Sequence, residues 1–408
     1  MQKPNHKESV SPVLQNVYAV LALPPPPNNW SINDWYTKKI CGVSLLVRNI
    51  LNLQLAELNS LILYSNKDST ELHKRLGEEK KISIKWDWTT DITEVTKSTK
   101  DYYVLILNGS ALYTKKEIQS VLNYTTNSND TFAQFLERET MTQTLEQIVF
   151  RNEFSLDRSV GNQNSRVVFL PGREDSRISQ PQDFLTQHEN LLKGSGLSND
   201  SFLDRTVTRF FSHQLTRFFL KTPLSPNIIT LLSLVIGLVS AVYFFQGTYE
   251  NNLIGAGLLL LSAWIDCTDG EIARLKFMES KIGGKLDIIC DNLVHFAVFL
   301  SIGIGLYQAT GQIIFIILGA FAVLGSLFLF LLLSSSIIDE KKKSSGNPAL
   351  MVKKDLTAKL ANRDFIYLIF LMALVGRVDV FIFITAVGSN FFAGYLIYSR
   401  FKSYLQTS

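Results

Sequence analysis

Hydrophobic residues are distributed unevenly along the chain, and the two halves carry different patterns. Residues 1–200 mix polar and apolar positions, whereas residues 226–400 are mostly Leu, Ile, Phe, Val, Gly and Ala. A helix needs about 20 apolar residues to cross the hydrocarbon of a bilayer. The second half therefore predicts an all-α membrane domain of six helices, with spans near 226–246, 253–273, 284–306, 311–337, 364–378 and 380–399.

The count of six depends on the last two spans. Only Gly376-Arg377-Val378-Asp379 separates them, so a re-entrant hairpin at this place would leave five spans. Six is the main prediction, and five is its alternative.

Basic residues fall almost entirely on one side of the predicted spans. The opposite side carries only Arg377, in the connections 246–252, 307–310 and 376–379. Loops rich in Lys and Arg stay in the cytoplasm, so we expect both termini and these thirteen residues there: Arg274, Lys276, Lys281, Lys285, Lys341, Lys342, Lys343, Lys353, Lys354, Lys359, Arg363, Arg400 and Lys402. The first residues lack an apolar core, which predicts no signal peptide and favours a bacterial inner membrane.

The stretch 204–221, directly before the first span, has a basic residue at every fourth position. Apolar residues fill most of the other positions, which is typical of a helix in the membrane interface with its cations toward anionic lipid headgroups. A soluble amphipathic helix packed on the first domain is the alternative. The basic stripe consists of Arg205, Arg209, His213, Arg217 and Lys221.

The first half alternates short apolar runs with helical stretches. Such alternation favours a doubly wound α/β fold. We expect a disordered tail at 1–13, a cytoplasmic α/β domain at 14–198, an interfacial helix and linker at 199–223, and a transmembrane domain at 224–402. The predicted strands are 17–23, 60–64, 82–86, 102–107 and 166–170, and the predicted helices are 43–58, 69–77 and 114–123.

Composition excludes several classes of protein. The chain has 408 residues, of which 46% are hydrophobic, and a mean hydropathy of +0.13. With a membrane half it is neither a simple soluble globule nor a disordered chain, and three cysteines without a Cys-x-x-Cys pair form no disulfide framework. A net charge of +4 gives no argument for a nucleic-acid partner.

Two pairs of carboxylates stand at the predicted cytoplasmic ends of consecutive membrane helices. Asp266 and Asp269 are three residues apart, and Asp287 and Asp291 are four apart, so each pair shares one helix face. Ionisable groups at membrane depth are costly and indicate function. Four converging carboxylates need cations between them, and hard oxygen ligands favour Mg²⁺ or Mn²⁺. The alternative is that they are ordinary helix-end residues.

Small residues and one arginine accompany these carboxylates. Gly270 and Gly283 allow backbone or ligand to come close, and the guanidinium of Arg274 suits a phosphate. A divalent-metal site with an arginine fits a phosphate-bearing substrate. A spare carboxylate could take the proton of an attacking hydroxyl.

The spacing of these residues resembles the signature of the CDP-alcohol phosphotransferases (CDP-alcohol phosphatidyltransferases). The pattern is Asp-x-x-Asp-Gly-x-x-Ala-Arg, eight residues, then Gly-x-x-x-Asp-x-x-x-Asp. The resemblance covers roughly residues 200–400. It matches at every position: Asp266, Asp269, Gly270, Ala273, Arg274, Gly283, Asp287 and Asp291.

The resemblance implies a metal-dependent transferase of substituted phosphate groups. Asp266, Asp269 and Asp287 would hold two ions of Mg²⁺ or Mn²⁺. Asp291 would be shared between metal binding and catalysis, deprotonating the acceptor hydroxyl. That oxygen would attack the phosphorus that bears the donor alcohol, and CMP would leave.

The resemblance also implies the partners. Gly270, Ala273 and Arg274 would hold the CDP group, and the family works as a homodimer in the membrane. The expected donor is CDP-diacylglycerol or a related CDP-lipid, and the acceptor is a hydroxyl compound such as a polyol or polyol phosphate. The expected role is in phospholipid or phosphodiester synthesis.

The first domain resembles a sugar-phosphate nucleotidyltransferase that has lost its site. Residues 41–64 are similar to the second segment of those enzymes, and 102–113 to their central strand and the following loop. The arrangement of both domains resembles bifunctional inositol-phosphate cytidylyltransferase/di-inositol phosphate synthases. However, Pro24–Pro27 stand where a Gly-rich basic loop is expected, and Asn108-Gly-Ser110 where a metal-binding aspartate is expected. We therefore expect an inactive domain that serves as a docking or regulatory platform, or is a remnant kept for folding.

Two other functions stay open at this point. A bifunctional enzyme would make its own CDP-polyol donor in residues 1–200. A non-catalytic membrane scaffold would have no need of the full signature. A transporter is disfavoured, because transport sites usually lie near the membrane midplane.

Overall fold

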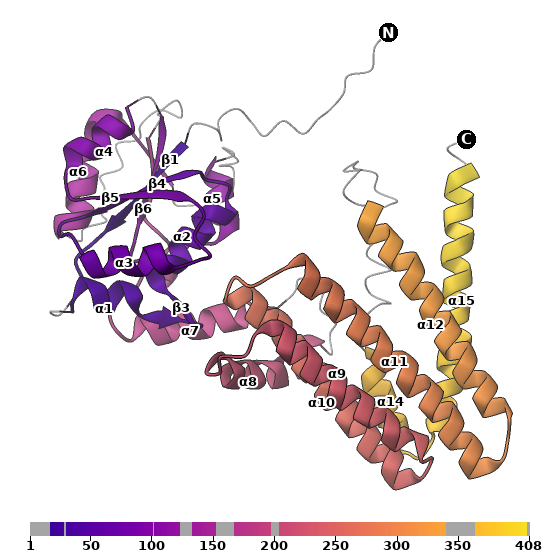
Figure 1. Cartoon of the computed structure of the whole chain (residues 1–408). Helices are drawn as coiled ribbons and strands as arrows, with labels where there is room; N and C mark the ends of the chain where they lie inside the picture. The colour runs from indigo at the N-terminus through magenta and orange to yellow at the C-terminus, as the bar shows by residue number, and fades with distance from the viewer. Residues whose placement is uncertain are drawn as a thin grey trace. The chain divides into compact units, whose positions relative to one another are not determined.

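The computed structural model shows two compact units, Met1–Leu191 and Leu192–Ser408 (Figure 1). The tail predicted at 1–13 lies outside the part of the chain that the structure describes. The described residues are 17–27, 30–100, 102–122, 133–151, 167–196, 204–339 and 364–405.

A six-stranded sheet is the centre of the N-terminal unit. Its buried strands have apolar side chains on both faces, as parallel strands covered by helices do. Val20 of the central strand lies beside Ile62 of one neighbour and Ile106 of the other. The order is β5 (Lys85–Thr89), β4 (Ser60–Ser65), β1 (Val17–Leu23), β6 (Tyr103–Asn108), β8 (Val167–Leu170) and β7 (Gln134–Leu136), all parallel except β7.

Helices connect these strands, and their first turns are capped as the sequence favours. The Ser69 hydroxyl accepts from Leu72 N–H, and the Asp91 carboxylate accepts from Thr93 N–H. The helical segments are α1 (Ile32–Thr37), α2 (Leu45–Leu55), α3 (Thr70–Glu78), α4 (Ile92–Ser98), α5 (Lys115–Leu122), α6 (Arg138–Glu146), a π-helix (Gln147–Arg151) and α7 (Asp183–Lys193); β2 (Lys39–Ile40) and β3 (Val43–Ser44) form a short hairpin.

The five predicted strands are confirmed, with one displaced. The strand predicted at 82–86 is observed as β5, Lys85–Thr89. The Gln54 side chain explains the shift, because its oxygen accepts from the N–H groups of Ser83 and Ile84 at 2.7 and 3.2 Å. The backbone N–H groups of residues 83 and 84 are thus bonded to a side chain instead of a neighbouring strand, although the apolar run had indicated a strand there. The antiparallel β7 was not predicted, and the doubly wound arrangement remains a prediction.

The second unit is helical. It begins with a π-helical segment (Asp204–Thr208) and continues through α8 (Arg209–Leu220), α9 (Pro226–Phe245), α10 (Tyr249–Leu275), α11 (Lys281–Thr310), α12 (Ile314–Asp339), α14 (Asp364–Leu374) and α15 (Val378–Leu405) (Figure 1). Among the described residues, five helices are long and apolar enough to cross a membrane: α9, α10, α11, α12 and α15. Five such spans make the chain an integral membrane protein.

The fifth of the six predicted spans is shorter than expected. The stretch predicted at 364–378 forms α14, whose 11 residues extend about 16 Å at 1.5 Å per residue. The hydrocarbon core is about 30 Å thick. The helix ends because Gly376 adopts a φ of +71° and Arg377 N–H donates to the Met372 carbonyl at 2.8 Å.

Aromatic and aliphatic side chains form the core of the helical unit. Phe244, Phe299 and Phe381 are buried together with Ile369 of α14. Gly237 on α9 permits the close packing of its neighbours, because a Cβ there would lie 2.6 Å from Val294 on α11. This packing brings the ends of α9, α10 and α11 together.

Candidate active site

The signature residues lie in the last turns of α10 and the first turns of α11, on either side of a short turn. Helix α10 ends at Leu275, where Phe277 adopts a φ of +54° and Met278 N–H donates to the Ala273 carbonyl at 2.7 Å. Ser280 then caps α11, and its hydroxyl accepts from Gly283 N–H at 2.9 Å. The chain therefore reverses within a few residues, and the two aspartate pairs face one another.

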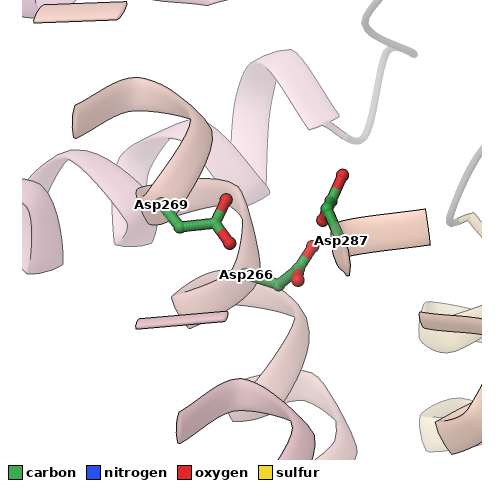
Figure 2. Close-up of side chains that lie close together, drawn as sticks. All are labelled: Asp266, Asp269 and Asp287. Atoms are coloured by element: carbon green, nitrogen blue, oxygen red, sulfur yellow. The ribbon is translucent and has the colours of Figure 1, made fainter. Parts of the chain in front are cut away.

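Three carboxylates meet across this turn (Figure 2). One oxygen from each of Asp266, Asp269 and Asp287 lies within 4.8 Å of the other two. Asp266 and Asp269 are 4% and 6% exposed, and Asp287 is half-buried. The structure thus brings together three of the four predicted aspartates in one group.

This group fits a divalent cation. Buried carboxylates close to one another are costly unless a positive charge lies between them. Oxygen-only donor sets suit hard ions such as Mg²⁺ or Mn²⁺ rather than zinc. Asp266, Asp269 and Asp287 are the residues that would hold such an ion.

Helix α9 supports two of these carboxylates. The hydroxyl of Thr230 donates to the Asp269 carboxylate, and the hydroxyl of Ser233 donates to Asp266 at 3.3 Å. Gly283 keeps the start of α11 close, because a Cβ there would lie 3.0 Å from the side-chain oxygen of Asn227 on α9. Three helices therefore fix the carboxylates in place.

Asp291 lies one turn beyond Asp287 on α11. Together with Asp266, Ser233 and His295 it lines a small cavity of about 20 Å³. His295 also packs against the ring of Phe365, with centroids 4.9 Å apart. Asp291 is thus adjacent to the carboxylate group, at the wall of a space that can hold a reacting atom.

The predicted nucleotide residues are on α10, beside the carboxylates. The guanidinium of Arg274 passes over Gly270, so that a Cβ at Gly270 would lie 3.2 Å from Arg274 Nη1. Arg274 Nε donates to the carbonyl of Ser195, within the same unit, at 2.8 Å. Ala273 accepts from Met278 N–H and so belongs to the turn that ends the helix.

Sequence reasoning missed Glu271, which lies between Gly270 and Arg274. Its side chain is fully buried and accepts from Arg209, Ser212 and Thr216 of α8. The prediction that Arg209 and His213 face lipid headgroups is therefore wrong, because their side chains are 12% and 19% exposed and turn toward Glu271. An acidic residue inside an apolar helix, with hydroxyl residues four apart upstream, was the available signal.

Open α/β sheets usually bind ligands at the carboxyl ends of their strands, and in the N-terminal sheet the residues at these ends bond to one another. Gly109 N–H donates to the Ala22 carbonyl at 2.7 Å. This bond connects β1 to the residue that follows the end of β6. The Tyr36 hydroxyl donates to the Pro24 carbonyl at 2.9 Å and contacts Ser110 Oγ at 3.1 Å. Asn108, at the place of the expected aspartate, accepts from Ser110 N–H at 2.9 Å.

Comparison with known proteins identifies the helical unit. Residues 223–392 match the family model of CDP-alcohol phosphatidyltransferase. This segment, less than half of the chain, is similar to that family. All eight positions of its predicted signature lie inside the matched range.

Curated relatives carry names of the same chemistry. A "Bifunctional IPC transferase and DIPP synthase" of Archaeoglobus fulgidus is 32% identical over 181 residues, which are 43% of this chain and 34% of the relative. An "Archaetidylinositol phosphate synthase" of Pyrococcus horikoshii is 29% identical over 82 residues, 20% of this chain and 42% of the relative. The chain thus spans well under two thirds of the length of either relative.

A solved structure is also similar. It is the Mycobacterium tuberculosis phosphatidylinositol phosphate synthase with CDP-DAG bound, which is 19% identical, with a TM-score of 0.35, over 47% of this chain and 92% of that one.

Proposed function

We propose that the chain is a CDP-alcohol phosphotransferase. It transfers a substituted phosphate group from a CDP-alcohol to an acceptor hydroxyl and releases CMP. The observation that carries this proposal is the meeting of three carboxylate oxygens within 4.8 Å, supplied by two helices of the family's signature.

A divalent ion, Mg²⁺ or Mn²⁺, bound by Asp266, Asp269 and Asp287 would supply charge neutralisation for the phosphates. The family resemblance gives two ions, with Asp291 shared. Asp266 and Asp269 are only 4% and 6% exposed, which favours tight binding of the ion over loose association at the surface.

The reaction needs a base, and in this proposal Asp291 has that role. Its carboxylate takes the proton of the acceptor hydroxyl, whose oxygen forms a bond to the phosphorus that bears the donor alcohol. The bond from that phosphorus to the bridging oxygen breaks, and the oxygen leaves with CMP. The small cavity shared by Asp291 and Asp266 supports this assignment.

Gly270, Ala273 and Arg274 bind the CDP group in this proposal. Arg274 meets the phosphates, and Gly270 leaves the space through which its guanidinium passes. The donor is CDP-diacylglycerol or a related CDP-lipid. The names of the curated relatives favour an inositol-bearing acceptor among polyols and polyol phosphates.

The N-terminal unit is proposed to be inactive in nucleotide transfer. Hydrogen bonds made by Tyr36, Ser110 and Gly109 at the carboxyl ends of β1 and β6 support this. Cytoplasmic orientation, six membrane helices and a homodimer complete the proposal, on the basis of the basic connections and the family resemblance. The six helices are the five long ones and the shorter α14.

The test is CMP release by the purified full chain with Mg²⁺ or Mn²⁺ and CDP-diacylglycerol. Acceptors are inositol, inositol phosphate, glycerol phosphate, serine and choline, and Asp291→Asn is the control variant. Release that requires one acceptor and is lost in Asp291→Asn supports the proposal. Failure with every acceptor, followed by failure with CDP-inositol and CDP-glycerol, would favour a scaffold.

A further inference from the structure

Glu271 is a charged residue buried deep in the signature helix, yet it faces away from the carboxylate group. Successive residues of an α-helix turn by about 100°, which places Glu271 on nearly the opposite face from Asp266 and Asp269. Its side chain has no exposed surface. Among the described residues, the contacts that reach it come from α8.

Three donors from α8 surround the Glu271 carboxylate. Arg209 Nη1 donates to Oε1 at 2.5 Å, and the Ser212 hydroxyl donates to the same oxygen at 2.7 Å. The Thr216 hydroxyl donates to Oε2 at 2.6 Å. Both carboxylate oxygens therefore accept hydrogen bonds. Hydrogen bonds to an ionised group are stronger than those between neutral groups.

The first turn of α8 and the π-helical segment before it make two further contacts with the helical unit. Phe211 stacks on Trp264 of α10, with ring centroids 3.9 Å apart. The hydroxyl of Thr208 lies 2.7 Å from that of Tyr367, which also accepts from Trp264 Nε1 at 3.2 Å. Helix α8 thus contacts α10 at two levels, nearly two turns apart.

We propose that Glu271 is a positioning residue that fixes the rotation of the last turns of α10. The last turns of α10 rotate about the helix axis as one body. When α8 fixes the position of Glu271, it therefore also fixes the directions in which Asp266, Asp269 and Arg274 point. An apolar contact would tolerate small rotations. Hydrogen bonds are directional, so two hydroxyls and a guanidinium around one carboxylate allow only one rotation of α10.

Glu271 and Arg209 form a buried ion pair, and this supports a positioning role for Glu271. Replacing a buried pair with apolar residues often leaves stability unchanged or raises it, so such a pair is weak evidence for stability. Polar groups inside a helix interface can instead fix register. Here the pair lies at the level of the metal and nucleotide residues, where a misplaced turn would matter most.

The inference rests on the proposed function, and its test separates the two. Binding of Mn²⁺ to the purified full chain is measured by electron paramagnetic resonance, which needs no turnover. In Glu271→Gln we expect Mn²⁺ affinity to fall about tenfold, within the range seen when supports of metal ligands are removed. With an active donor and acceptor, KM for the donor rises by a similar factor, while kcat at saturating metal and donor changes less than about threefold.

Two further variants keep the test decisive. The double variant Ser212→Ala with Thr216→Val removes only hydroxyls from the α8 side, and we expect it to weaken Mn²⁺ binding in the same direction. Gln214→Ala, on the exposed face of α8, is the matched control and should leave Mn²⁺ affinity unchanged.

Unchanged Mn²⁺ affinity in both Glu271→Gln and the hydroxyl variant would overturn the inference, even if thermal stability fell. If the wild-type chain binds Mn²⁺ but transfers no phosphate group, the proposed function fails while the positioning role is still tested. If Glu271→Gln does not fold, the hydroxyl variant decides alone.

Discussion

The hydroxyl of Thr230 on α9 donates a hydrogen bond to the carboxylate of Asp269 on α10. Thr230 is buried, with 3% of its surface exposed. A hydrogen bond at this place fixes which way the carboxylate turns, so that its other oxygen can face the metal group. Helix α9 thus contributes to the site without supplying a ligand.

Thr230→Val keeps the shape of the side chain and removes this donor. We expect Mn²⁺ affinity to fall about tenfold or more, because partners of metal ligands typically matter by 10 to 100-fold. A Mn²⁺ titration followed by electron paramagnetic resonance measures it. Thr310→Val is the control, because Thr310 lies at the far end of α11 and its hydroxyl bonds only to the backbone of Leu306 and Gln312 among the described residues. Equal affinity in the two variants would contradict the account.

Gly270→Ala tests the place of Arg274. The new Cβ would lie 3.2 Å from Arg274 Nη1, so the guanidinium must move from its position over the helix. We expect KM for the CDP donor to rise about tenfold, equivalent to about 1.4 kcal/mol of binding. Initial rates at varied donor concentration measure the change.

The matched control for that experiment is Gly257→Ala. Gly257 lies on the same helix, and a Cβ there would meet open space. Its KM for the donor should stay at the wild-type value. A similar rise in both variants would show that the helix as a whole, rather than Arg274, was disturbed.

Alkaline pH should destabilise the N-terminal unit. Burial raises the pKa of the Tyr36 and Tyr113 hydroxyls far above their usual value. An acid whose pKa is higher in the folded state stabilises the fold below its unfolded pKa of about 10 and loses that contribution as pH rises further. The free energy of unfolding should therefore fall above pH 10, by about 1.4 kcal/mol per pH unit for each hydroxyl.

Urea unfolding followed by tryptophan fluorescence checks this expectation, because Trp30, Trp35, Trp86 and Trp88 are in the N-terminal unit and only Trp264 is outside it. Tyr36→Phe removes one of the two hydroxyls. Its stability should be lower at neutral pH, through loss of the bonds to Pro24 and Ser110, but should decline less steeply above pH 10. Parallel pH curves for the two proteins would exclude Tyr36 as a cause.

Much of the fold was predictable because helices and buried strands leave a period in the sequence. The aspartate pairs share helix faces by spacing alone, and the structure brings Asp266, Asp269 and Asp287 together. The end of α14 at Gly376 and the displacement of β5 by the Gln54 side chain depend on individual hydrogen bonds to the backbone. The pattern of hydrophobic residues gives no indication of such bonds.

The sequence marked Glu271 as unusual but could not assign its partners, for a different reason. Its partners Arg209 and Thr216 come from 62 and 55 residues earlier in the chain. A basic stripe before a membrane span has the same sequence whether it faces lipid or a buried carboxylate. Only the packing of α8 on α10 decides between them.

The central claim is that the carboxylate group transfers a phosphate group from a CDP-alcohol. The most direct measurement is the yield of CMP and of the new phosphodiester in one reaction, by mass spectrometry, for the full chain, Asp287→Asn and Asp379→Asn. Asp379 is the control, since it pairs with Arg377 at 3.0 Å outside the carboxylate group. The account predicts equal amounts of the two products in the wild type and in Asp379→Asn, and neither product in Asp287→Asn. CMP without the phosphodiester, or full yield from Asp287→Asn, would contradict it.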